Sequence, residues 1–165
     1  MIDQNAEIVA SASGSTPWWA EGIYAAELWA LLNASLMAFP GSPFMVDCKA
    51  VQVGANNGPA WARSPSRRFG RAWVPLSHAI EDYPGSVVWM PAHCGQSAVG
   101  VECMSNGQLL SEVDLFANDK VDSLATAVAG RRAPSREERK IVSEASQLVI
   151  DIARWIGQIT VLEQP

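Results

Sequence analysis

The chain has 165 residues, a formal net charge of −5 at pH 7, and 48% hydrophobic against 18% charged residues. This balance predicts one globular domain with a buried core and argues against a disordered chain. The acidic balance also argues against a broadly basic nucleic-acid binder, although it leaves room for a local basic patch. The three cysteines fit neither a disulfide framework nor a zinc site, so we expect Cys48, Cys94 and Cys103 to be free thiols.

No stretch of the sequence approaches the roughly 18 consecutive apolar residues that a membrane-spanning helix needs. The N-terminus lacks the basic region and hydrophobic run of a secretory signal. We therefore expect an intracellular protein without a membrane segment, and the sequence does not choose between nucleus and cytoplasm.

The first part of the chain predicts a turn at 3–5, a half-buried strand at 7–13 and a helix at 23–36. In the strand, alternation places Ile8, Ala10 and Ala12 on one face. The helix is rich in alanine and leucine, and the Pro-Gly pair at 40–41 ends it. A short apolar run at 44–46 is typical of a buried strand, with Asp47 at its carboxyl end.

The middle of the chain predicts two helices, a strand and a long loop. The first helix covers 49–56 and stops at the turn residues 56–59. A basic loop at 63–71 leads into a helix that reaches about Asp82, and a buried strand follows at 87–90. Residues 91–112 then form a loop long enough to suggest a functional or mobile segment.

The last part predicts two helices joined by a linker. The first covers 114–129 with Ser111 or Asp114 as its cap, and the linker covers 130–134. The second opens at Ser135 with an S-x-x-E capping box. Its apolar residues recur every three or four positions and must be buried against this domain or a neighbouring one; they are Ile141, Ala145, Leu148, Ile152, Trp155 and Ile159.

Alternating strands and helices predict an α/β fold with a parallel or mixed sheet. In such sheets, ligands bind outside the carboxyl ends of the strands. Asp47 and His93 both lie at or just past a predicted strand end. An active pair of His93 with the adjacent Cys94 is disfavoured, because neighbouring side chains on an extended segment point in opposite directions.

Three carboxylates stand in places that solvation alone does not explain well. Glu27 lies among apolar residues of a helix, Asp47 ends a buried strand, and Asp122 lies on a helix between Val121 and Leu124. Each has an ordinary alternative explanation. Glu27 could be favoured near a helix N-terminus, Asp47 could cap the helix that follows it, and Asp122 could form an exposed ion pair. Together they offer the oxygen ligands that Mg²⁺ or Mn²⁺ prefers.

Four segments resemble ribonuclease H in the order of that family. Residues 26–31 (AELWAL) resemble its A-E-L-x-A-L helix, and residues 46–51 (VDCKAV) resemble its T-D-S-x-x-V strand end. Residues 89–95 (WMPAHCG) resemble W-x-x-G-H-x-G, and residues 118–125 (NDKVDSLA) resemble N-E-x-A-D-x-L-A. The tryptophan-rich style is similar to ribonuclease H-like domains in retroelements of dinoflagellate algae.

This resemblance implies a ribonuclease H-like mixed sheet with flanking helices over residues 1–130, followed by a linker and an extra amphipathic helix in 131–165. It implies two Mg²⁺ or Mn²⁺ ions held by Glu27, Asp47 and Asp122, with His93 at the site and Asn118 as a supporting residue. The implied activity is hydrolysis of RNA in RNA–DNA hybrids, and an adjacent reverse-transcriptase or other polyprotein domain is an implied partner.

One departure from the family is the absence of D-G-S, the motif of its first and central strand, whose Asp binds both metals. In the family order 3-2-1-4-5, this loss leaves the strand at 44–47 unpaired on one edge. We therefore expect an N-terminally truncated or degenerate domain that alone binds Mg²⁺ weakly and cleaves little or no hybrid.

The strongest basic cluster consists of Arg63, Arg67, Arg68 and Arg71, with Trp61 and Trp73 on either side. Guanidinium groups beside aromatic rings suit phosphate contact and base stacking, and a solvated helix face is an equal alternative. Two other functions stay open. One is a catalytically dead nucleic-acid-binding or scaffold module, and the other is a different two-metal nuclease or transposase.

Overall fold

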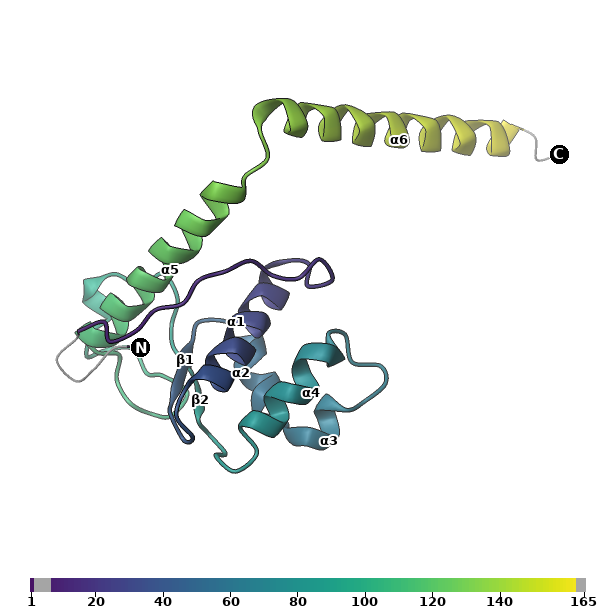
Figure 1. The fold of residues 1–165 in the computed structure, drawn as a ribbon. Helices are drawn as coiled ribbons and strands as arrows, with labels where there is room; N and C mark the ends of the chain where they lie inside the picture. The colour runs from purple at the N-terminus through teal and green to yellow at the C-terminus, as the bar shows by residue number, and fades with distance from the viewer. Residues whose placement is uncertain (2–6, 163–165) are drawn as a thin grey trace. The chain divides into compact units, whose positions relative to one another are not determined.

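The computed structural model describes residues 1 and 7–162 and has a mixed α/β architecture (Figure 1). Six helices and a small two-stranded parallel sheet make up the regular structure of these residues. The chain divides into two compact units, residues 1–126 and residues 127–165. Within the described residues, no helix combines the length and apolar character needed to cross a membrane.

The sheet consists of β1 (Phe44–Val46) and β2 (Val87–Trp89), which pair in parallel. Phe44 lies opposite Val87, and Val46 lies opposite Trp89. Both strands were predicted from their apolar runs. Because they pair in parallel, the carboxyl ends of two strands that are far apart in the sequence lie at the same edge of the sheet. Asp47 follows β1 directly at this edge.

Helices α1 (Ile23–Met37), α2 (Lys49–Asn56) and α4 (Gly70–Ala79) build the main core with the sheet. Their buried side chains include Leu28 of α1, Val51 of α2 and Trp73 of α4, which pack with Val87 of β2. A short helix, α3 (Gly58–Ala62), forms where the sequence predicted only a stop. Proline is compatible with the first turn of a helix because that turn leaves its N–H groups unpaired.

The opposite face of β2 belongs to a second, smaller cluster of buried side chains. Successive strand residues point to opposite faces, so Val88 turns away from Val87 and packs with Met90, Met104 and Leu110. The predicted long loop therefore folds onto the sheet. It contains a short 3₁₀ helix, η1 (Gln96–Ala98), and an isolated antiparallel bridge between Cys103 and Leu109.

The prediction for the N-terminal segment was wrong in the described residues. Residues 7–13 form no strand there beyond a single bridge position at Ile8, and Ile8, Ala10 and Ala12 are all exposed rather than half-buried. Alternation of apolar and polar residues is not sufficient for a strand that lacks an extended partner. The predicted turn at 3–5 lies outside the described residues.

Helix α5 (Glu112–Arg132) begins just after Ser111, one of the two predicted cap residues, and hydrogen bonds between Ser111 and Asp114 form a capping box there. The Asp114 N–H donates to Ser111 Oγ at 3.2 Å, and the Ser111 N–H donates to Asp114 Oδ2 at 3.0 Å. The helix continues through 130–132, where a linker was predicted, because neither Gly130 nor the arginines after it prevent helical backbone.

Helix α6 (Arg136–Leu162) confirms the capping box that was predicted at Ser135. The Glu138 N–H donates to Ser135 Oγ at 3.1 Å, and the Ser135 N–H donates to Glu138 Oε2 at 2.7 Å. This bond lowers the pKa of Glu138 below its usual value, because the ionised carboxylate is the better acceptor. Within the unit 127–165, the predicted apolar face of α6 is largely exposed, including Leu148 and Trp155.

Candidate functional site

Three elements of the unit 1–126 carry the predicted carboxylates. Glu27 lies on α1 beside the buried Ala25 and Leu28, which fix that face of the helix against the core. Asp47 lies at the bend between β1 and α2, and Asp122 lies near the middle of α5. Glu27 and Asp47 are half-buried, whereas Asp122 is exposed.

The structure brings these carboxylates close enough for their charges to interact. Burial raises the pKa of Glu27 above its usual value of 4.5, and the negative charges of Asp47 and Asp122 raise it further. Like charges held together on three separate elements disfavour ionisation of the most buried member. Glu27 is therefore the carboxyl group on which the charges of the other two act.

The cluster is not a closed coordination site. In the described part of the chain, no three His, Cys, Asp or Glu side chains lie close enough together to hold one metal ion. The donor chemistry nonetheless fits a hard cation, because all three groups offer carboxylate oxygens. A cation at this cluster would also relieve the repulsion that raises the pKa of Glu27.

Trp89 fixes the strand end that carries Asp47. Its indole Nε1–H donates to the Asp47 carbonyl oxygen at 2.9 Å, across the two paired strands. The Lys49 ammonium lies 5.0 Å from the centre of the Trp89 ring, where the face of the indole attracts a cation. The tryptophan that begins the WMPAHCG segment therefore positions the aspartate of another segment.

His93 and Asn118, the two other predicted site residues, take different positions. His93 is exposed and has a φ of 54°, in the left-handed region that non-glycine residues rarely adopt. Among the described residues, the structure gives His93 no hydrogen bond or ion pair, and it contributes nothing to the shifted pKa of Glu27. Asn118 is half-buried on α5, one turn before Asp122 and on the same face of the helix.

Two arginines of the predicted basic cluster are engaged within the protein. The Arg63 guanidinium lies 3.2 Å from His78 Nε2, and His78 Nδ1 lies 3.4 Å from a Glu81 carboxylate oxygen. The Arg67 guanidinium stacks on Trp61 at 3.7 Å from the ring centre. These two residues therefore help to hold α3 and α4 in place, which leaves Arg68 and Arg71 as the freer cations.

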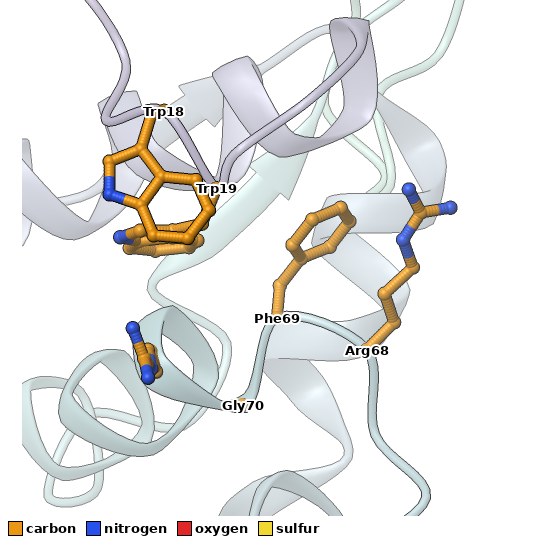
Figure 2. A pocket seen from close by; sticks show the side chains of 6 residues that line it. Trp18, Trp19, Arg68, Phe69 and Gly70 are labelled. Atoms are coloured by element: carbon orange, nitrogen blue, oxygen red, sulfur yellow. The ribbon is translucent and has the colours of Figure 1, made fainter.

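Only one of the two aromatic residues expected beside this cluster, Trp61, stacks with one of its arginines. Trp73 is buried and meets the edge of Trp61 at 5.0 Å between ring centres, so it offers no stacking surface. Instead, Trp18 and Trp19 approach the cluster from the loop before α1. They line an open pocket of about 410 Å³ with Arg68, Phe69, Gly70 and Arg71 (Figure 2). The only sequence signal for this pocket was a pair of tryptophans in a loop.

All three cysteines are free in the structure, as their number and spacing predicted. Cys94 Sγ lies 3.5 Å from the Ala92 carbonyl oxygen, a local contact that tethers it beside the Pro91 turn. Cys103 is exposed at the antiparallel bridge to Leu109.

No protein-family model, no curated protein sequence and no solved structure matches this chain. Its function is therefore inferred from its own side chains, chiefly the carboxylates around Glu27 and the arginines around α4.

Proposed function

We propose that residues 1–126 form a ribonuclease H-like domain that acts in metal-dependent hydrolysis of RNA in RNA–DNA hybrids. The observation that carries this proposal is the charge interaction of Glu27 with both Asp47 and Asp122. The three carboxylates come from motifs separated along the chain, and the charges of Asp47 and Asp122 both act on the partly buried Glu27. A partly buried carboxyl group whose pKa is raised by burial and by two neighbouring negative charges is a candidate functional group.

Glu27, Asp47 and Asp122 would supply carboxylate oxygens to Mg²⁺ or Mn²⁺, although no three side chains of the described residues are grouped closely enough to hold one ion together. The metal would activate a water molecule and stabilise the charge on the leaving oxygen. The chain's own contribution is to position Asp47 through the bond from Trp89 and to keep Glu27 partly out of water. Asn118 lies on the helical face of Asp122, where it suits the supporting role that the resemblance implies.

The topology supports the same proposal. In ribonuclease H the strands that carry the second aspartate and the histidine segment are neighbours and run parallel, in the order 3-2-1-4-5. Here β1 and β2 are neighbours and pair in parallel, with α1 before them and α5 after them. Asp47 and the segment that leads to His93 thus leave the sheet at the same edge.

An RNA–DNA hybrid is recognised by its shape, its phosphates and its 2′-hydroxyl groups rather than by base sequence. Arg68 and Arg71 are the cations of the basic cluster best placed for phosphate contact, since Arg63 and Arg67 are engaged with His78 and Trp61. We therefore propose backbone contacts from α4 and no strong sequence preference.

Two observations favour a second function, a catalytically inactive module that binds hybrid or scaffolds other domains. The sequence contains no D-G-S, and the described residues contain no group of three side chains ready to hold one metal ion. Binding to the hybrid through α4 does not need either feature, so binding and cleavage are separable.

Both functions are tested by giving the purified chain a labelled RNA–DNA hybrid and a duplex DNA of the same sequence, with Mn²⁺ or Mg²⁺. The proposed function predicts slow, metal-dependent cleavage of the RNA strand alone, lost in Asp122→Asn. Asp119→Asn, on the same helix, is the matched control and should retain it. Hybrid binding without cleavage would support the inactive module, and absence of binding would reject both functions.

A further inference from the structure

The pocket in front of α4 has aromatic walls that play no part in the hydrolysis proposed above. We infer that it binds an unpaired nucleotide of single-stranded RNA or DNA, with the base between Trp18 and Phe69 and the phosphates at Arg68 and Arg71. The pocket's volume of about 410 Å³ lies within the range of small-molecule sites and is open at the surface where a continuous strand could enter and leave.

The two sides of the pocket carry aromatic rings that are fixed from behind. Trp19 meets Trp29 of α1 edge to face at 5.7 Å, and Phe69 packs against Tyr24 at 6.0 Å between ring centres. Trp18 is 86% exposed. Figure 2 shows Trp18 and Trp19 on one side of the pocket and Phe69 across from them. An indole left in water beside a fixed ring is a ready stacking surface for a base.

The backbone at Phe69 is strained in a way that serves this arrangement. Its φ of 62° and ψ of 29° place a bulky aromatic residue in the left-handed region, immediately before α4 begins at Gly70. Conformations of this kind cost roughly 1–3 kcal/mol and persist where the surrounding structure or a function requires them. Here the conformation accompanies a ring at the rim of the pocket instead of one buried beneath it.

The side chains that line the pocket carry positive charge and no negative charge. Arg68 and Arg71 line it, no lining residue is acidic, and the first turn of α4 contains no acidic side chain. The Arg68 guanidinium lies 4.7 Å from the centre of the Phe69 ring, and Figure 2 shows it on the side of that ring away from the two tryptophans. The positive end of α4 adds to this preference for an anion.

Aromatic walls and arginines together select the class of ligand. A base in a duplex has both faces stacked on its neighbours, so only an unpaired base can enter between two protein rings. An acidic peptide offers charge without a planar face for Trp18. The inference is independent of the carboxylates, because neither stacking nor phosphate contact here needs a metal ion.

The test measures binding of fluorescent 12-residue oligo-dT and oligo-U to the full chain, by anisotropy, in EDTA so that the metal site plays no part. A blunt duplex DNA of equal length and an acidic peptide are the competitors. Trp18→Ala should weaken single-strand binding by about tenfold, as expected for one stacked base. Trp155→Ala, which removes another exposed tryptophan from α6, is the matched control and should leave binding unchanged.

Arg71→Ala should weaken binding at low salt and reduce the slope of log affinity against log salt by about 0.7, the value for one lost phosphate contact with a single strand. Equal binding of duplex and single strand, equal losses in Trp18→Ala and Trp155→Ala, or displacement by the acidic peptide would each overturn the inference. Preference between oligo-U and oligo-dT identifies RNA or DNA as the source. Metal-free binding that fails while hybrid cleavage succeeds would remove this pocket and leave the proposed hydrolysis standing.

Discussion

Trp89 and Asp47 are joined by a hydrogen bond of 2.9 Å from the indole Nε1–H to the aspartate's carbonyl oxygen. The bond connects the carboxyl ends of β2 and β1, so it ties the position of a candidate metal ligand to a residue of the neighbouring strand. Trp89→Phe keeps an aromatic ring but leaves this half-buried carbonyl without its donor. We expect a loss of about 1–3 kcal/mol in the free energy of unfolding.

Urea denaturation followed by circular dichroism measures that loss, with Trp155→Phe on the exposed face of α6 as the control. An unchanged unfolding midpoint in Trp89→Phe would show that water replaces the indole at no cost. If the proposed function holds, the same variant should also bind Mn²⁺ more weakly near Asp47, because the strand end that carries this carboxylate becomes less fixed.

Replacing Gly54 by alanine should destabilise the protein, although alanine favours a helix more than glycine does. A Cβ atom at this position of α2 would lie 2.7 Å from Trp73 Cζ2 and 3.1 Å from Trp61 Cη2, and closer still to Trp73 Cη2. Gly54→Ala should therefore destabilise the protein by about 1–3 kcal/mol, the usual cost of overpacking a core. In an open helix the same substitution stabilises by up to about 1 kcal/mol.

Gly157→Ala is the matched control, because nothing lies within 4 Å of the position that its Cβ would take in α6. The two variants should shift the thermal unfolding of their own units in opposite directions. A stabilised Gly54→Ala would mean that Trp73 and Trp61 can move apart without loss of packing.

The sequence predicted the positions of the helices and strands better than the way in which segments pair and pack with one another. Apolar runs placed β1 and β2, and the capping box at Ser135 placed the start of α6. These signals are local, since each depends on residues within a few positions of one another. The exposed segment at 7–13 shows the limit, because whether an alternating segment becomes a strand depends on a partner elsewhere in the chain.

For the candidate site too, local sequence signals predicted some features, and contacts between distant segments decided the others. Motif order predicted that Glu27, Asp47 and Asp122 form one site, and in the structure the charges of Asp47 and Asp122 raise the pKa of Glu27, after the larger effect of burial. Of the two aromatic residues predicted beside the basic cluster, Trp61 stacks with Arg67 and Trp73 does not contribute. Sequence neighbours suggested Trp73, whereas packing buries Trp73 and brings Trp18 from a distant loop to Arg68 and Arg71. Such a contact depends on how α1 packs on α4, which no local pattern encodes.

Ser135 makes a prediction about the start of α6. Its hydrogen bonds with Glu138 hold the pKa of that carboxyl below its usual value. Because the pKa of Glu138 is lower in the folded than in the unfolded chain, its carboxylate stabilises the helix start at pH values above its pKa in the unfolded chain. This stabilisation is lost as the pH falls through its pKa in the folded chain. Ser135→Ala should raise the pKa of Glu138 and fray the first turn, whereas Ser143→Ala in the middle of α6 should do neither. Carboxyl chemical shifts followed through a pH titration measure both effects.

Glu27 makes the converse prediction, because burial and the charges of Asp47 and Asp122 raise its pKa. The native state then holds the proton more tightly than the unfolded chain, so stability falls as the pH rises above the usual value of 4.5. Glu27→Gln removes the penalty while keeping the shape of the side chain. We expect this variant to be more stable than the wild type near neutral pH, with the difference shrinking below about pH 4.

Glu21→Gln, at an exposed position before α1, is the control and should show no such pH dependence. Addition of Mg²⁺ completes the test, since a cation bound at the carboxylates stabilises the native state by mass action. It should raise the unfolding temperature of the wild type at neutral pH and leave that of Glu27→Gln nearly unchanged. Equal stabilisation of both proteins would place the ion elsewhere and separate the electrostatic strain at Glu27 from metal binding.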